Sequence, residues 1–136
     1  MNYYFVGYVY KCNYVMVQTM KRRKESDTIS TFKEIYKELK TKGHQTKLHV
    51  LDNKCSKAVK NYIISKQTNI QLVELHNHSV NAAKPAVKRP KYHALVAFAS
   101  LYPNFPIQLW DQFAEQTEIT VNLLRISRRN KNKSAY

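Results

Sequence analysis

One acidic side chain is a candidate for chemistry because of the stretch that precedes it. Asp52 follows residues 48–51, a stretch rich in branched and apolar residues and typical of a buried strand. In an α/β sheet, ligands and metal ions collect at the carboxyl ends of strands, so Asp52 is a candidate metal ligand. The alternative is structural: Asp, Asn and Ser all cap helices, and a helix is expected to begin near Ser56.

Histidines and a cysteine form a second candidate group. His76 and His78 flank Asn77, and Cys55 or His93 could complete a zinc site or an HNH-type nuclease site. The paired ligand spacing of zinc sites is missing, so neither assignment is favoured.

Basic residues suggest a polyanionic partner. The chain has 23 Lys and Arg against nine Asp and Glu, a net charge of +14, and such an excess favours nucleic acid. Three clusters are candidate phosphate contacts: Lys21, Arg22, Arg23 and Lys24; Lys88, Arg89 and Lys91; Arg125, Arg128 and Arg129. The first cluster could instead be a solvated loop or a weak nuclear localisation signal. The tail, residues 125–133, is expected to be disordered or to lie along a phosphate backbone.

Length and composition limit the remaining possibilities. A chain of 136 residues with 43% hydrophobic residues predicts one globular domain. Its two cysteines form no spaced framework, which favours a reducing, intracellular location, in the nucleus or the cytoplasm. The apolar residues 1–10 are interrupted by Lys11 far short of a membrane span, so a strand is expected there and no membrane association.

Two strands and one helix open the chain. Aromatic and branched residues at 3–10 and 14–18 predict a β-hairpin, with Asn13 in its turn. Its tyrosines could stack on bases, but strand spacing favours core positions. A helix follows, capped by residues 26–28 and ending near Gly43.

Later elements predict an α/β fold with a mixed sheet. The Asp52 strand precedes a helix and another strand at 70–75, and a helical crossover makes these strands parallel. Residues 82–101 have helical composition, with Pro85 tolerable in the first turn and a break expected near Pro90. A last helix is expected over residues 107–125. Its apolar face consists of Leu109, Trp110, Phe113, Val121 and Leu124.

Several motifs, taken together and in order, carry a family resemblance. They are Leu51-Asp52-Asn53, His76-Asn77-His78, Asn81-Ala82-Ala83, Leu109-Trp110-Asp111 and residues 119–125. From about Asn2 to Tyr136 the chain resembles the integrase catalytic core of Copia-type LTR retrotransposon polyproteins. The resemblance implies a ribonuclease-H-like fold that joins element DNA to target DNA, using two Mg²⁺ ions held by an Asp, Asp, Glu set. Hard oxygen ligands suit this chemistry.

This sequence departs from that set of ligands. Asp52 matches the family's second Asp, whereas Lys84 stands where the family has Glu. The family's first Asp lies on a strand that precedes the hairpin, before this sequence starts. We therefore expect a ribonuclease-H-like mixed sheet flanked by helices, lacking the family's first, central strand. We also expect Asp52 to be a vestigial ligand that binds no Mg²⁺ and pairs with Lys84.

The resemblance leads to one expected function and leaves alternatives open. Residues 1–102 would be a partial integrase core, residues 103–126 its C-terminal helix, and residues 127–136 a basic tail. The expected function is that of a catalytically inactive polyprotein fragment, a pseudoenzyme that binds DNA without sequence specificity. The alternatives are a structural module that forms homo-oligomers, a relic without function, and an enzyme whose missing Asp comes from another chain.

Overall fold

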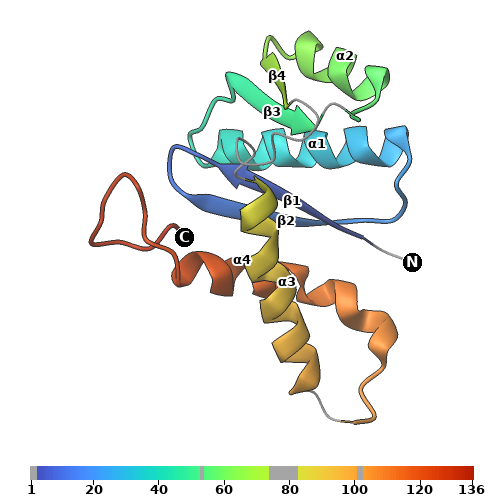
Figure 1. Ribbon diagram of the computed structural model, residues 1–136, viewed down its shortest axis with the longest axis vertical. Coiled ribbons are helices and arrows are strands. Elements are labelled where there is room, and N and C mark those ends of the chain that lie inside the picture. The colour runs from blue at the N-terminus through green and yellow to red at the C-terminus, as the bar shows by residue number, and fades with distance from the viewer. Residues whose placement is uncertain (1–2, 53, 74–82, 101–102) are drawn as a thin grey trace. The chain divides into compact units, whose positions relative to one another are not determined.

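A computed structural model describes residues 3–52, 54–73, 83–100 and 103–136, without the side chains of residues 83, 84 and 107 (Figure 1). The chain divides into two compact units. The first comprises residues 20–81, and the second combines residues 2–19 with residues 82–136. The predicted boundary at residues 102 and 103 therefore falls inside the second unit. No helix in the described ranges is long and apolar enough to cross a bilayer.

The first unit contains a parallel pair of strands joined through a helix. Its elements are α1 (Glu25–Thr41), β3 (Leu48–Asp52), α2 (Lys57–Ser65) and β4 (Asn69–Val73). Leu48 lies opposite Asn69, and Asp52 lies opposite Val73. The predicted parallel crossover is confirmed. The prediction that β3 is buried is wrong, since Leu48 is 51% exposed: a strand in a two-stranded sheet has too few neighbours to cover both of its faces.

Helix α1 forms where its apolar spacing predicts, but it begins slightly earlier. Phe32, Ile35 and Leu39 are buried along one face. The helix begins at Glu25, and its N-cap residue makes no side-chain hydrogen bond. The predicted caps at residues 26–28 therefore lie in the first turn. The negative charges of Glu25 and Asp27 in this turn interact favourably with the positive end of the helix dipole. Gly43 has a φ of 75° just beyond the helix end, in the left-handed region that glycine tolerates.

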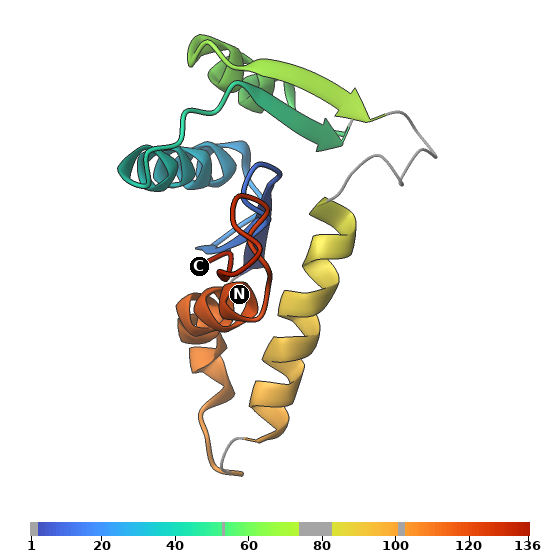
Figure 2. The same ribbon diagram turned by 90° about the vertical axis from the view of Figure 1, so that its left-hand side faces the viewer.

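The second unit packs a hairpin against helices. Strands β1 (Tyr3–Val9) and β2 (Tyr14–Met20) are joined through Asn13, whose φ of 65° confirms the predicted turn. Helix α3 (Ala83–Ala99) contacts both β1 and α4 (Phe113–Leu123), and Figure 2 shows its yellow ribbon alongside theirs. The buried core of this unit lies where these elements meet. It consists of Val15, Val17, Ala86, Ala114 and Val121, with Tyr4, Val6 and Tyr8 packed against them.

The fold is α/β, but its strands are divided between two sheets. The described strands form one two-stranded sheet of β1 and β2 and another of β3 and β4. A single mixed sheet was expected, so this part of the prediction is corrected. One physical reason is visible at β2, where backbone groups that could pair with a further strand are bound by side chains of α4.

Helix α3 continues through Pro90, which contradicts the predicted break. Pro90 is among the most deeply buried side chains in the chain, and Ala86 one turn before it is also buried. Proline in a helix interior costs about 3 kcal/mol relative to alanine. Burial of its ring removes apolar surface from water and so offsets part of that cost, which sequence spacing alone does not reveal. Pro85 lies in the first turn, as expected.

The predicted last helix is two elements. A 3₁₀ helix, η2 (Ile107–Gln112), leads into α4, which ends at Leu123. Leu124, assigned to the apolar face, is 76% exposed. The tail is also ordered, contrary to one of its two predicted states: Ile126 bridges Ser134, and Ala135 N–H donates to Arg125 O at 2.8 Å.

Candidate functional site

Asp52 lies where the sequence placed it, at the carboxyl end of β3. Its side chain is exposed, and its carbonyl oxygen accepts a hydrogen bond from Cys55 N–H at 3.0 Å. The capping role belongs to Ser56, whose Oγ accepts from Val59 N–H at 3.4 Å. The helix cap therefore does not account for Asp52, and its position at a strand end remains its notable property.

The residues described do not fit a pair of Mg²⁺ ions. Two such ions need several carboxylate or carbonyl oxygens arranged around them. Among the described residues, no group of three or more His, Cys, Asp or Glu side chains is placed to hold a metal. At the position of the family's Glu the sequence has Lys84, whose ammonium cannot ligate a cation. Within the described ranges, neither unit therefore brings together the carboxylates that two Mg²⁺ ions need.

Two predicted contacts lie outside what the structure describes. Helix α3 contains the backbone of Lys84, but the side chain of Lys84 is not described, and Asp52 belongs to the other unit. The pairing of these two residues stays a prediction. The stretch His76-Asn77-His78 also lies outside the described residues. Its proposed zinc partners are half-buried: Cys55 precedes α2, where burial raises the pKa of its thiol, and His93 lies in α3.

Most of the predicted phosphate contacts are exposed. The first cluster, residues 21–24, is exposed and forms the link between β2 and α1. It ends at Lys24, the N-cap residue of α1. On α3, Lys88, Arg89 and Lys91 all point to solvent. Lys88 and Lys91 are three residues apart and so lie on neighbouring positions of one helix face. Arg128 and Arg129 are exposed in the tail. Arg128 stays exposed although its Nη1 donates to Tyr10 O at 3.2 Å.

Arg125 differs, because it is half-buried and bound to the hairpin turn. Its Nε donates to Asn13 O at 2.9 Å, and its Nη2 donates to Asn13 Oδ1 at 2.5 Å. Its guanidinium also lies 5.6 Å from the centre of the Tyr8 ring. Asn13 Nδ2 in turn donates to Ile126 O at 2.8 Å. These contacts fix the start of the tail on the hairpin and occupy the guanidinium that was expected to contact phosphate.

A histidine that sequence reasoning did not single out lies in an aromatic cluster of the first unit. His49 Nε2 is 2.7 Å from the hydroxyl of Tyr36, and the rings of Phe32 and Tyr36 meet the imidazole edge to face. Burial lowers the pKa of His49 and raises that of Tyr36. A neutral imidazole whose Nε2 accepts a hydrogen bond from the Tyr36 hydroxyl suits this arrangement. The available sequence signal was its place inside the strand, between the apolar residues Leu48 and Val50.

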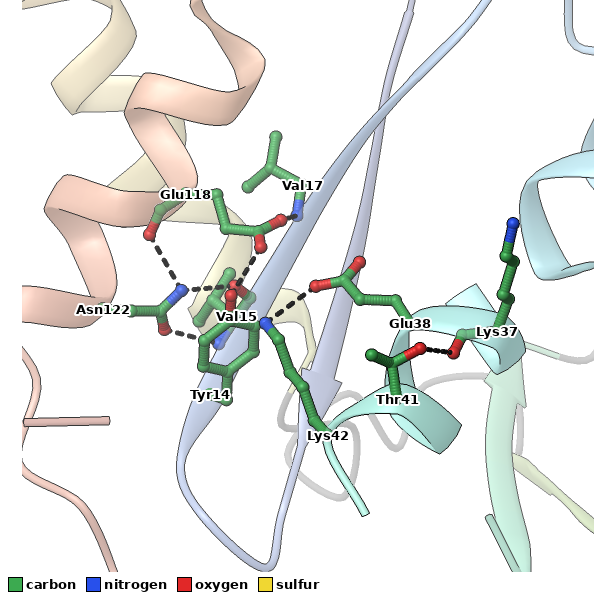
Figure 3. Close-up of polar contacts among 9 residues, drawn as sticks. All are labelled: Tyr14, Val15, Val17, Lys37, Glu38, Thr41, Lys42, Glu118 and Asn122. Carbon is green, nitrogen blue, oxygen red and sulfur yellow. Dashed lines mark hydrogen bonds and ion pairs between the residues drawn. The ribbon is translucent and has the colours of Figure 1, made fainter. Parts of the chain in front are cut away.

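A buried polar pair on α4 was also missed. Glu118 and Asn122 are 9% and 0% exposed, and Figure 3 shows both pointing at the backbone of β2. Asn122 Oδ1 accepts from Val15 N–H at 2.8 Å, and Glu118 Oε2 accepts from Val17 N–H at 2.6 Å. The sequence signal for this pair was its spacing, because the buried positions of α4 recur at helical intervals. They are Ala114, Thr117, Glu118, Val121 and Asn122.

Comparison of the chain with protein-family models and with curated proteins gave no match.

Proposed function

We propose that this chain is a catalytically inactive derivative of a retroelement integrase core that binds nucleic acid through its positive charge. The observation that carries the proposal is a long segment without acidic residues. Between Glu74 and Asp111 the sequence has no Asp or Glu, yet it contains Lys84, Lys88, Arg89 and Lys91. The segment itself contains no carboxylate side chain to offset these positive charges, so its composition favours a polyanion.

Helix α3 presents basic side chains at a spacing that suits phosphate contacts. Lys88, Arg89 and Lys91 are exposed within one turn of a continuous helix. Ammonium and guanidinium groups so spaced can neutralise neighbouring phosphates and release their counterions. Such contacts read no base sequence, which supports binding without sequence specificity.

Loss of catalysis is proposed on separate grounds. Of the family's acidic ligands, the sequence contains a match at Asp52 and has Lys84 at the position of the Glu. A cation at that position would repel the metal ion that the reaction needs. DNA joining is therefore not expected, whereas phosphate binding does not depend on the missing ligands.

A matched pair of double variants tests the binding site. We expect Lys88→Gln with Lys91→Gln to reduce the slope of log affinity against log salt by about 2, because about one counterion is released for each phosphate contact. Lys37→Gln with Lys40→Gln is the control, since these lysines are also exposed and three residues apart, on α1. Fluorescence anisotropy with a labelled DNA duplex measures both slopes. Equal slopes for the two double variants would contradict the assignment to α3.

A further inference from the structure

Helix α4 takes the place of a neighbouring strand along one edge of β2. Val15 N–H donates to Asn122 Oδ1 at 2.8 Å, and Asn122 Nδ2 donates to Val15 O at 2.7 Å (Figure 3). Val17 N–H donates to Glu118 Oε2 at 2.6 Å. Alternate residues of a strand direct their backbone groups to the same edge. These three groups therefore belong to one edge, and side chains of α4 satisfy all three.

The contact between α4 and β2 is deeply buried, and its polar side-chain atoms all have hydrogen-bond partners. Val15 and Asn122 are both 0% exposed. Asn122 Nδ2 also donates to Glu118 O at 2.8 Å, and the Tyr14 hydroxyl donates to Glu118 Oε1 at 2.5 Å. Among the described residues, no buried side-chain nitrogen or oxygen lacks a hydrogen-bond partner. Removing either side chain would leave buried backbone groups unsatisfied, which is costly.

Strand β2 lacks the usual protection of a sheet edge. Natural edges are guarded by charged residues or proline, because exposed N–H and C=O groups are a template for another strand. Residues 12–20 contain no charged residue and no proline. Val15, Met16 and Val17 are apolar, and valine favours strands. If α4 moved away, this edge would be well suited to pair with another strand.

We propose that Glu118 and Asn122 form a latch that closes this edge against pairing with β2 of a second copy of the chain. A second copy fits because the edge is self-complementary. In an antiparallel pair centred on Met16, Val15 of one copy lies opposite Val17 of the other, and each N–H meets a C=O. Opening the latch thus converts a buried edge into a self-association surface.

Single substitutions on α4 test the latch. Asn122→Ala and Glu118→Ala remove its two halves, and Glu118→Gln keeps an acceptor for Val17 N–H. Glu115→Ala is the control, because Glu115 is exposed on the same helix and its loss changes the net charge as Glu118→Ala does. Light scattering during size-exclusion chromatography should show a mass that rises with concentration for the two latch alanine variants, approaching twice the wild-type value. The control and Glu118→Gln should behave as wild type.

Hydrogen exchange identifies the surface that associates. At low concentration, the Val17 amide of Glu118→Ala should exchange faster by about tenfold or more, while the Val15 amide stays protected by Asn122. At high concentration the protection of Val17 should return. Association without this recovery, or no association beyond that of the control, overturns the proposal.

Wild-type protein decides the question if both alanine variants fail to fold. In urea below the unfolding transition, transient opening of α4 would let copies pair. The Val15 and Val17 amides should then exchange more slowly as the protein concentration rises. Exchange at both amides that is independent of concentration would overturn the proposal.

Discussion

Asp52 and Lys84 are the residues on which the proposed loss of metal chemistry depends. Mg²⁺ requires near-octahedral oxygen ligation and loses water reluctantly, so one exposed carboxylate is a poor site. We expect calorimetry to show no Mg²⁺ or Mn²⁺ binding above background, and strand-transfer assays to show no activity. Lys84→Glu should restore at most weak metal binding and no DNA joining. Metal-dependent joining of DNA by the unmodified chain would refute the proposed loss of catalysis.

His49 should make stability depend on pH. Burial lowers the pKa of the folded-state imidazole, so below about pH 6.5 the unfolded chain binds a proton that the folded chain resists. The contribution of His49 to the free energy of unfolding should therefore be complete above that pH. It should decrease as the pH falls from about 6.5 towards the lowered folded-state pKa of His49.

Urea unfolding at pH 7.5 and at pH 5.5 measures this effect. His49→Gln removes the titrating group and should show a smaller loss of stability between the two pH values than the wild type. His44→Gln is the control, because His44 lies outside the aromatic cluster, in the link that follows α1. An equal loss in the wild type and in His49→Gln would contradict a role for His49.

At the scale of elements, Ser56 rather than Asp52 caps α2. Replacing an N-cap serine by alanine costs about 0.5 to 2 kcal/mol. The bond from Val59 N–H to Ser56 Oγ is long, at 3.4 Å, so Ser56→Ala should lower the free energy of unfolding by an amount near the lower limit. Ser30→Ala, at an exposed position within α1, should be neutral or slightly stabilising. Chemical denaturation of both variants measures the difference, and equal stabilities would exclude the cap.

The β1–β2 hairpin binds the side chain of Arg125, a basic residue that was expected to contact phosphate. The hairpin turn presents Asn13 O and Oδ1 to the guanidinium, and the Tyr8 ring lies beside it. A charged side chain with these partners contributes to the order of the tail. The exposed basic residues of α3 and of residues 128–133 are the better candidates for phosphate contacts.

For the whole molecule, net charge should make binding sensitive to salt. If about six basic side chains contact phosphates, affinity for DNA should fall by about 10³-fold between 50 and 200 mM salt. The large excess of Lys and Arg over Asp and Glu is the physical reason. Filter binding over a salt series measures the decrease. Affinity that is independent of salt would refute binding through charge.

The sequence by itself determined the elements whose signals are local. The turn at Asn13, the apolar face of α1 and the parallel crossover from β3 to β4 follow from residue preferences and from spacing within short windows. It also placed Asp52 at the end of a strand. The turn and the helix face depend on neighbours a few residues away. The parallel pairing, which joins Leu48 to Asn69, follows from the strand–helix–strand order.

Tertiary structure decided the features that depend on distant partners. Asn122 is buried because Val15, 107 residues away, offers backbone groups for its amide. Pro90 is accommodated in α3 where burial of its ring offsets part of the cost of a lost helical hydrogen bond. Leu124 is exposed because α4 ends before it. Whether a side chain is buried or exposed is set by the surfaces that fold against it, and a pattern along the chain contains no record of those surfaces.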